Sequence, residues 1–190
     1  MALIQCKNVS LAYDGTVVAE QIDFSVHRGE YLCIVGENGS GKSTLVKGLL
    51  GLMHPVCGTI EYGDGLTRQD IGYVPQQTNV QRDFPASVRE VVLSGTIGRG
   101  SRSLFYTSEQ KKTAAHAMER LGIADCAGRM LAELSGGTRQ KAYIAMALAQ
   151  DTSVVLLDEP TTFLDIAHQL QLMTLAKELA AKGKTVVLVL

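Results

Sequence analysis

The sequence has 190 residues, which is long enough for one compact domain with a sizeable core. Its 18 basic and 19 acidic residues nearly balance, and no block of like charge indicates nucleic acid or an anionic membrane as the main partner. The N-terminus lacks the charged region and apolar run of a signal peptide, and no apolar run approaches the length of a membrane span. Any membrane role is therefore expected to come through a partner.

The cysteines and histidines do not have the spacing of a metal site. The four cysteines are scattered without a CxxC pair, which is typical of reduced thiols in a cytosolic protein. The four histidines are equally dispersed, and this favours solvated or hydrogen-bonded side chains over metal ligands.

Two strand-like segments open the chain, over 3–11 and 17–26, and a turn signal at Tyr13-Asp14-Gly15 separates them. They predict an antiparallel sheet beside the rest of the fold. Tyr13 lies at the turn, where a surface tyrosine is the simpler interpretation and a ring that stacks on a nucleobase is the alternative.

A phosphate-binding loop is the strongest motif in the sequence. The apolar run 31–35 predicts a strand, a glycine-rich turn follows it, and a helix is predicted over 42–53, ended by His54-Pro55. This strand–turn–helix order is the context that the pattern G-x-x-x-x-G-K-[ST] requires. The pattern is matched by Gly36, Gly41, Lys42 and Ser43, with Gly39 as a further flexible position.

The residue types explain how such a loop holds a triphosphate. Glycines let successive N–H groups turn inward around a phosphate, and the following helix directs the positive end of its dipole at the same anion. Lys42 supplies a mobile charge for the outer phosphates, and the Ser43 hydroxyl is placed to ligate Mg²⁺. We therefore predict a nucleoside-triphosphate site, and an ordinary glycine-rich loop is the less favoured interpretation.

Further strands are predicted over 58–62 and 71–74, and the second ends at Pro75. Gln76 follows at the strand end, where open α/β sheets face their ligands. Taken alone, this position is a weak signal, because polar loops commonly have this composition.

The composition changes after this point, and helices are predicted over 88–94 and from Thr107 to Leu121, capped by Ser87 and by a capping box at Thr107. We interpret this part as an inserted helical subdomain. Ser135-Gly136-Gly137 then precedes an apolar helix and forms a second potential anion site at a helix N-terminus. A lone turn of this kind is more often a simple cap, but the earlier phosphate loop favours a functional role.

A continuous apolar run over 154–157 predicts a buried parallel strand that ends in Asp158-Glu159. Two carboxylates at the end of a buried strand are costly unless they hold Mg²⁺ or activate water. The alternative, a surface acidic pair, is disfavoured by the apolar residues that precede it. A helix over 166–181 and a buried strand over 185–190 complete the sequence.

In this order, the motifs resemble those of the nucleotide-binding domain of an ATP-binding-cassette (ABC) ATPase over essentially the whole length. The segment LSGG upstream of an apolar strand that ends in Asp-Glu is much more specific than a phosphate loop alone. The resemblance implies an α/β P-loop NTPase (RecA-like) core with an antiparallel β subdomain and an inserted helical subdomain. Within this single domain, 1–79 and 143–190 would form the β subdomain and the core, and 80–142 the helical subdomain with the LSGG signature.

The resemblance also implies roles for the residues that match the family motifs. Asp158 would organise the Mg²⁺ shell with Ser43, Gln76 would contact the metal and the attacking water, and Glu159 would act as the general base, with Lys42 on the phosphates. Tyr13 would stack on adenine. The remaining nucleotide-binding positions would be Gly36, Asn38, Gly39, Ser40, Gly41 and Thr44, with Ser135, Gly136 and Gly137 supplied across a head-to-tail homodimer in which Asp165 lies at the interface.

As a cassette of this family, the chain would bind ATP and Mg²⁺ and hydrolyse ATP at the cytoplasmic face of a membrane, coupling dimer closure to transport through an integral membrane permease. The stretch over 83–95 is similar to the ATPases of zinc and manganese importers, which implies a metal-ion importer with a solute-binding protein and no nucleic-acid partner. The alternative is a soluble ABC-type protein that dimerises on ATP for regulation or assembly, without a transport role.

Two positions depart from the family pattern. The signature reads LSGGT where LSGGQ is usual, so Thr138 stands in place of glutamine. The family also places a switch histidine directly after the last strand, and none of His27, His54, His116 and His168 matches it. We therefore expect a C-terminally truncated domain, and we hypothesise that it binds ATP but hydrolyses it poorly because a γ-phosphate contact is missing.

Overall fold

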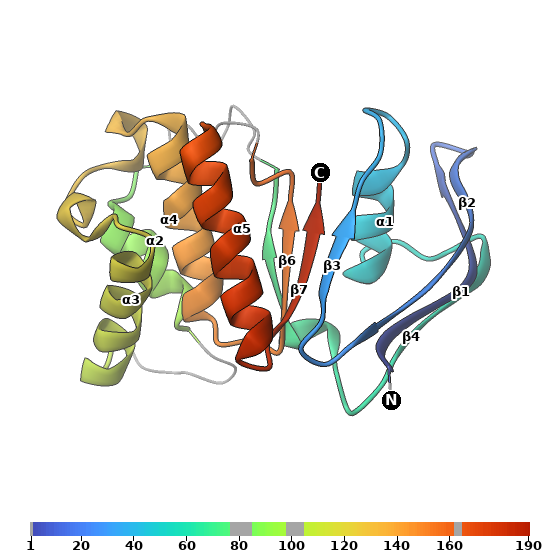
Figure 1. Cartoon of the computed structure of the whole chain (residues 1–190), viewed down its shortest axis with the longest axis horizontal. Coiled ribbons are helices and arrows are strands. Elements are labelled where there is room, and N and C mark those ends of the chain that lie inside the picture. The colour runs from blue at the N-terminus through green and yellow to red at the C-terminus, as the bar shows by residue number, and fades with distance from the viewer. Residues whose placement is uncertain (1, 77–84, 98–104, 162–164) are drawn as a thin grey trace.

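The computed structural model describes residues 2–76, 85–97, 105–161 and 165–190 (Figure 1). Within these ranges the strands form two sheets, an antiparallel one of order β2-β1-β4 and a parallel one of order β3-β7-β6-β5. The predicted α/β class and the antiparallel sheet are therefore confirmed.

The antiparallel sheet is built on the N-terminal hairpin. Its turn is formed by Asp14 and Gly15, whose φ angles of 47° and 79° are those of the tight two-residue turn that the sequence predicts. A further strand, Cys57–Tyr62, pairs antiparallel with the first strand of the hairpin, along the edge that the second strand does not occupy. The strands are β1 (Ala2–Tyr13), β2 (Thr16–His27) and β4 (Cys57–Tyr62).

The parallel sheet lies at the centre of the domain, and two of its strands are buried along their whole length. Side chains alternate between its faces, so that on β6 Leu156 joins the core beside α1 whereas Leu157 joins the core beside α5. The apolar run expected for a buried parallel strand is thus confirmed. The strands are β3 (Tyr31–Ile34), β5 (Ile71–Val74), β6 (Val154–Asp158) and β7 (Thr185–Val189).

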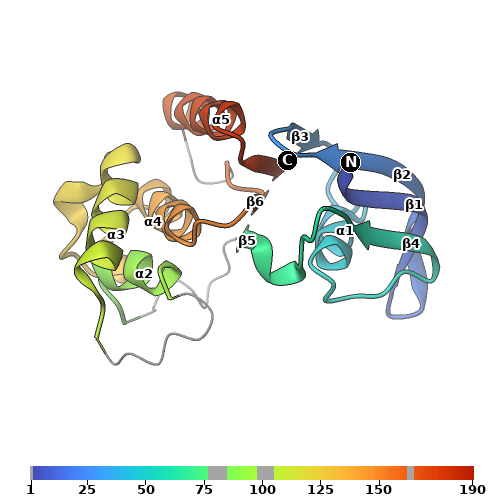
Figure 2. The same ribbon diagram turned by 90° about the horizontal axis from the view of Figure 1, so that it is seen from below.

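Helices cover both faces of the parallel sheet. The helices α4 (Gly136–Ala149) and α5 (Ile166–Ala181) lie on one side, and α1 (Lys42–Leu49) lies on the other, between this sheet and the antiparallel one (Figure 1). The view from below also shows α1 on the opposite side of the parallel sheet from α4 and α5 (Figure 2). The phosphate loop therefore enters a helix that is packed between the two sheets.

The end of α1 corrects the sequence prediction. The helix stops at Leu49 rather than at residue 53, because Gly51 adopts a left-handed conformation with a φ of 64°. The N–H of Leu52 then donates to the carbonyl of Lys47, which closes the last turn in the manner of a glycine-terminated helix. The glycine, and not the later proline, ends this helix.

A second group of helices packs around its own apolar core. The helices α2 (Val88–Gly95) and α3 (Ser108–Arg120) begin at the predicted caps Ser87 and Thr107, and both caps form capping boxes. This core extends along α4 as far as Ala149, while Ala147 of the same helix joins the core of the parallel sheet. Because α4 belongs to both cores, we keep the division into 80–142 and the rest as a proposal.

Short 3₁₀ turns connect these elements, at Arg68–Asp70, Ala124–Cys126 and Leu131–Glu133. None of the helices in the described ranges combines the length and the apolarity that crossing a membrane requires.

Candidate functional site

The phosphate loop is shaped by glycines that no other residue could replace without strain. Gly39 and Gly41 have φ angles of 83° and 87°, in the left-handed region that disfavours a side chain. At Gly41 a Cβ would also lie 2.4 Å from the carbonyl oxygen of Val18 on β2. The antiparallel sheet thus fixes the loop from one side, and Val18 is a contact that the sequence analysis did not single out.

Lys42 folds back across this loop. Its side chain is buried, with only 8% of the residue exposed, and its Nζ donates hydrogen bonds to the carbonyls of Gly36 at 2.7 Å and Glu37 at 2.8 Å. An ammonium carries three N–H donors, so these two bonds leave one for a further acceptor. The predicted phosphate lysine is therefore anchored by the backbone of its own loop.

A hollow of about 190 Å³ lies over this loop and brings together residues from three separate motifs. It joins the turn of the hairpin, the start of α1 and the end of β6, as the family resemblance implied. A larger groove of about 720 Å³ lies among α3, α4 and α5, but none of the predicted site residues lines it. The smaller hollow is lined by Tyr13, Val18, Gly39, Gly41, Lys42, Ser43, Thr44 and Glu159.

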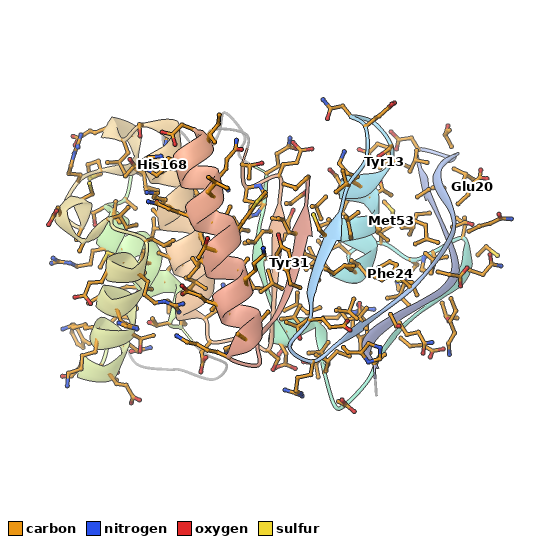
Figure 3. All side chains as sticks on the ribbon, viewed as in Figure 1. Tyr13, Glu20, Phe24, Tyr31, Met53 and His168 are labelled. Atoms are coloured by element: carbon orange, nitrogen blue, oxygen red, sulfur yellow. The ribbon has the colours of Figure 1, made fainter. Side chains whose placement is uncertain are left out.

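Tyr13 lies beside α1 at the turn of the hairpin (Figure 3), and about half of it is exposed. The ammonium of Lys47 lies 5.0 Å from the centroid of its ring, in the geometry of a cation–π contact. Lys47 was not predicted to belong to the site. Its spacing of one helical turn from Ser43 on α1 was the available signal, because residues four apart share one helix face.

Asp158 ends β6 in a buried position, with only 3% of it exposed. Its Oδ2 accepts a hydrogen bond of 3.2 Å from the Tyr73 hydroxyl, and its Oδ1 has no hydrogen-bond partner among the described residues. Burial raises the pKa of this carboxyl, and the Tyr73 hydrogen bond works in the opposite direction. Tyr73 is a second contact that the sequence analysis missed.

Glu159 follows in a strained conformation. Its φ of 45° lies in the left-handed region although it directly precedes Pro160, and its N–H donates to the carbonyl of Val189 on β7. On its side chain, Oε2 accepts a hydrogen bond of 2.6 Å from Nε2 of Gln76. The neighbouring strands β5 and β6 thus bring the predicted Gln76 and Glu159 together at the edge of the sheet.

The residues around Asp158 fit a magnesium ion. A buried carboxylate oxygen without a partner among the described groups is costly unless a cation or a donor reaches it. Ser43, exposed in the first turn of α1, lines the hollow together with Glu159, the residue that follows Asp158. Its hydroxyl is an oxygen ligand of the kind that Mg²⁺ prefers. Gln76 bonds Glu159 through its nitrogen, which leaves its amide oxygen for a cation or water.

The signature segment lies elsewhere. Ser135 caps α4, and its Oγ accepts from the N–H of Thr138 at 3.2 Å and shares a 2.9 Å hydrogen bond with the Thr138 hydroxyl. Gly136 and Gly137 form the first turn of this helix. Because α4 and α1 lie on opposite sides of the parallel sheet, one chain does not bring the signature to its own phosphate loop (Figure 1). The loop positions Gly36, Asn38 and Ser40 also do not line the hollow.

Comparison with known proteins now decides the family. Residues 19–162 match the family model described as ABC transporter. The chain belongs to the ABC transporter family. It is 39% identical over 191 residues to the manganese transport system ATP-binding protein MntB of Bacillus subtilis (strain 168), covering 98% of this chain and 76% of that protein. It is 35% identical over 189 residues to the zinc transport system ATP-binding protein TroB of Treponema pallidum (strain Nichols), covering 98% and 71%.

Solved structures agree with this assignment. The chain superposes with a TM-score of 0.83 and 34% identity on an inward-facing putative metal-chelate type ABC transporter, covering 100% of this chain and 73% of that one. It also superposes with a TM-score of 0.82 and 30% identity on the dimeric bacterial ABC transporter cassette MJ0796, covering 98% and 87%.

These matches confirm the ABC ATPase cassette fold with its P-loop core. The chain is thus an ATP-binding domain of the kind that couples ATP hydrolysis to transport, and the soluble regulatory alternative is not favoured. ABC ATPases of this kind form dimers and work with membrane permease subunits.

Proposed function

We propose that this chain is the ATP-hydrolysing subunit of a metal-ion importer and that it works as a homodimer on the cytoplasmic face of the membrane. The observation that supports the catalytic part most strongly is the 2.6 Å contact between Gln76 and Glu159 beside the hollow. It joins a residue at the end of one strand to the predicted base at the end of the next.

In this proposal ATP lies across the hollow. Adenine stacks on Tyr13, whose half-exposed ring offers a flat surface, while the backbone of the loop and Lys42 hold the phosphates. Ser43 and Asp158 would hold Mg²⁺, and the amide oxygen of Gln76 would be a further ligand. When bound, Mg²⁺ would neutralise negative charge on the outer phosphates.

Glu159 serves as the general base in this mechanism. Its carboxylate accepts the proton of the water that attacks the γ-phosphate, and Gln76 keeps the carboxylate in place through its hydrogen bond. The backbone of Glu159 is held by the last strand, so the side chain leaves the sheet in a fixed direction despite its unfavourable φ. Such preorganisation lowers the cost of placing the base at the moment of reaction.

A second copy of the chain completes the site. The N–H groups of Gly136 and Gly137 and the hydroxyl of Ser135 form an anion-binding helix terminus. Within one chain this terminus lies across the sheet from the phosphate loop, so it has no phosphate of its own to hold (Figure 1). A head-to-tail dimer would place it on the ATP of the partner and would bring Asp165, the cap of α5, to the interface.

The permease contact is proposed for the segment that starts at Gln76 and extends to residue 103. Residues 77–84 and 98–103 of this segment lie outside the described residues. The direct bond from Gln76 to Glu159 would carry the position of this segment to the catalytic carboxylate. A solute-binding protein is proposed as a further component of the importer.

The proposed cargo is a divalent metal ion such as manganese or zinc, because the relatives MntB and TroB are named for these ions. A competing cargo is a metal–siderophore complex, since the ferric enterobactin transport ATP-binding protein FepC of Escherichia coli (strain K12) is 36% identical over 199 residues. The chain's own site does not discriminate between them, because the ATPase subunit of a transporter does not bind the cargo.

Uptake in cells tests this proposal. The gene for the chain is deleted and restored in its own organism, either unchanged or as Glu159→Gln, and uptake of free manganese, zinc and a ferric siderophore is measured with radioisotopes. We expect deletion to reduce uptake of one free metal ion, the unchanged gene to restore it and the variant to fail. Loss of siderophore uptake alone would contradict the metal assignment, and full rescue by Glu159→Gln would contradict the ATPase role.

A further inference from the structure

We propose that Tyr73 is a positioning residue for Mg²⁺, which holds one oxygen of Asp158 so that the other faces the metal. The inference rests on the proposed Mg²⁺ site and adds a residue to it that the family motifs do not include. It follows from the contact between the Tyr73 hydroxyl and Asp158.

The contact is set by the register of two neighbouring strands. Tyr73 of β5 lies opposite Leu156 of β6, so its side chain reaches along the sheet to Asp158 at the end of the next strand. Its ring packs against the core between the parallel sheet and α1. Because the ring is held by this packing, the hydroxyl is held as well, and the hydrogen bond has a fixed direction.

The two carboxylate oxygens of Asp158 have different surroundings. Oδ2 accepts from Tyr73 at 3.2 Å, whereas Oδ1 is buried and has no hydrogen-bond partner in the part of the chain that the structure describes. The carboxylate group turns about its Cβ–Cγ bond, and a hydrogen bond to one oxygen opposes this rotation. The second oxygen therefore points in a defined direction. A hydrogen bond from an outer residue to a metal ligand is known to orient the ligand in this way.

A second hydrogen bond of the same kind joins the end of β5 to the end of β6. Gln76, after β5, donates to Glu159, just as Tyr73 within β5 donates to Asp158. The two acidic residues that end β6 are therefore both held by donors from the neighbouring strand and its exit. Gln76 lies after the strand, whereas Tyr73 is packed within it, so Tyr73 provides the fixed support for the metal carboxylate.

The simplest alternative is a core tyrosine whose hydroxyl only satisfies a neighbour. Tyr62 provides the matched comparison, because it packs against the same core and its hydroxyl donates to the carbonyl of Leu49 at 3.0 Å, away from the site. Removal of either hydroxyl with phenylalanine deletes one oxygen and one hydrogen bond. Only removal of the Tyr73 hydroxyl should weaken Mg²⁺ binding.

The test measures metal affinity rather than turnover. Purified chain is saturated with a non-hydrolysable β,γ-imido analogue of ATP, and Mg²⁺ affinity is obtained by competition against Mn²⁺ followed by electron paramagnetic resonance. We expect Tyr73→Phe to weaken Mg²⁺ binding about tenfold, the lower end for loss of an outer-shell partner. Affinity for the analogue in EDTA, and all values for Tyr62→Phe, should remain unchanged.

Asp158→Asn separates failure of this inference from failure of the proposed Mg²⁺ site. If Asp158→Asn weakens Mg²⁺ binding and Tyr73→Phe leaves it within twofold of the unsubstituted chain, the role of Tyr73 is overturned and the site stands. If Asp158→Asn has no effect on Mg²⁺ binding, the site itself is wrong and the inference falls with it. A loss of analogue affinity in EDTA for Tyr73→Phe would indicate a structural role and would also overturn the proposal.

Discussion

Nε2 of Gln76 donates a 2.6 Å hydrogen bond to Oε2 of Glu159, so the residue that opens the segment after β5 directly holds the carboxylate at the end of β6. The two residues are far apart in the sequence, and the parallel pairing of β5 with β6 brings them together. A displacement of Gln76 would therefore release or turn the carboxylate. This contact is a physical route by which a permease could control ATP hydrolysis.

Replacement of the proposed base should separate hydrolysis from binding. Glu159→Gln keeps the size of the side chain and an oxygen that can accept from Gln76, but it removes the group that takes the proton of the water. We expect ATP hydrolysis to fall by about 10² to 10⁴-fold relative to the unsubstituted chain, while ATP affinity changes little. Phosphate release and equilibrium nucleotide binding measure the two quantities.

Glu61→Gln is the control for this change, because Glu61 is an exposed carboxylate on β4 that pairs with Lys7 away from the site. It should leave hydrolysis unchanged. Hydrolysis that persists in Glu159→Gln would show that another group accepts the proton.

The two left-handed glycines of the phosphate loop should differ in their tolerance of alanine. Gly39→Ala introduces only an unfavourable φ, which costs about 1–2 kcal/mol, because nothing lies within 4 Å of the added Cβ. Gly41→Ala adds the clash with the Val18 carbonyl to the same cost, so it should lower the free energy of unfolding further and abolish ATP binding. Urea unfolding without nucleotide compares the variants, and equal losses would contradict the fixed position of the loop against β2.

Lys47 should strengthen ATP binding through Tyr13. Lys47→Met removes a cation–π contact of about 0.5–1 kcal/mol that holds the ring in place before ATP binds, so the loss in ATP affinity should be at most about two- to fivefold. Lys47→Arg should retain most of the affinity. If the effect depends on the ring, it disappears in a Tyr13→Ala background and for inorganic tripolyphosphate, which has no base.

A loss that persists for tripolyphosphate, or in the Tyr13→Ala background, would mean that Lys47 acts on the phosphates directly. Calorimetry on the four proteins of this double-mutant cycle distinguishes the two cases.

The buried carboxylate of Asp158 should reduce the stability of the metal-free protein at neutral pH. Burial raises its pKa above the value in the unfolded chain, so the unfolded state loses this proton first as pH rises. The free energy of unfolding therefore falls as pH rises through this range. Asp158→Asn removes this loss, and we expect the variant to be the more stable protein at pH 7, with a smaller difference at pH 3.

Urea unfolding in EDTA at both pH values measures this effect, and Asp125→Asn, at an exposed carboxylate, is the control. A variant Asp158→Asn that is less stable than the unsubstituted chain at pH 7 would show that the charged form is favoured by its surroundings.

Most of the fold and the site could be predicted because their signals are local. The turn at Asp14-Gly15, the caps Ser87 and Thr107 and the apolar run before Asp158 each depend on neighbouring residues, and the structure confirms all of them. The prediction for the end of α1 was wrong because Gly51, which is also a local signal, ends the helix before the later proline.

The missed contacts depend on distances across the fold. The hydrogen bond from Tyr73 to Asp158 requires the register of β5 against β6, and the contact of Gly41 with Val18 requires the packing of the hairpin on the loop. Neither is visible as a spacing in one sequence. The separation of Ser135 from the phosphate loop of its own chain also depends on packing across the fold, since α4 and α1 lie on opposite sides of the sheet (Figure 1). The sequence indicated this separation only through its resemblance to the family.

The central claim is that ATP is held between two copies of the chain, and the mass of the Glu159→Gln protein in solution tests it most directly. Light scattering with and without ATP is compared for this protein, for the same protein carrying Ser135→Arg, and for a control carrying Ser87→Arg, which loses a similar cap on α2. We predict that ATP doubles the mass of the Glu159→Gln protein and of the Ser87 control, and that Ser135→Arg prevents this while ATP still binds. A protein that remains monomeric when saturated with ATP, or a dimer that Ser135→Arg does not disturb, would contradict the account.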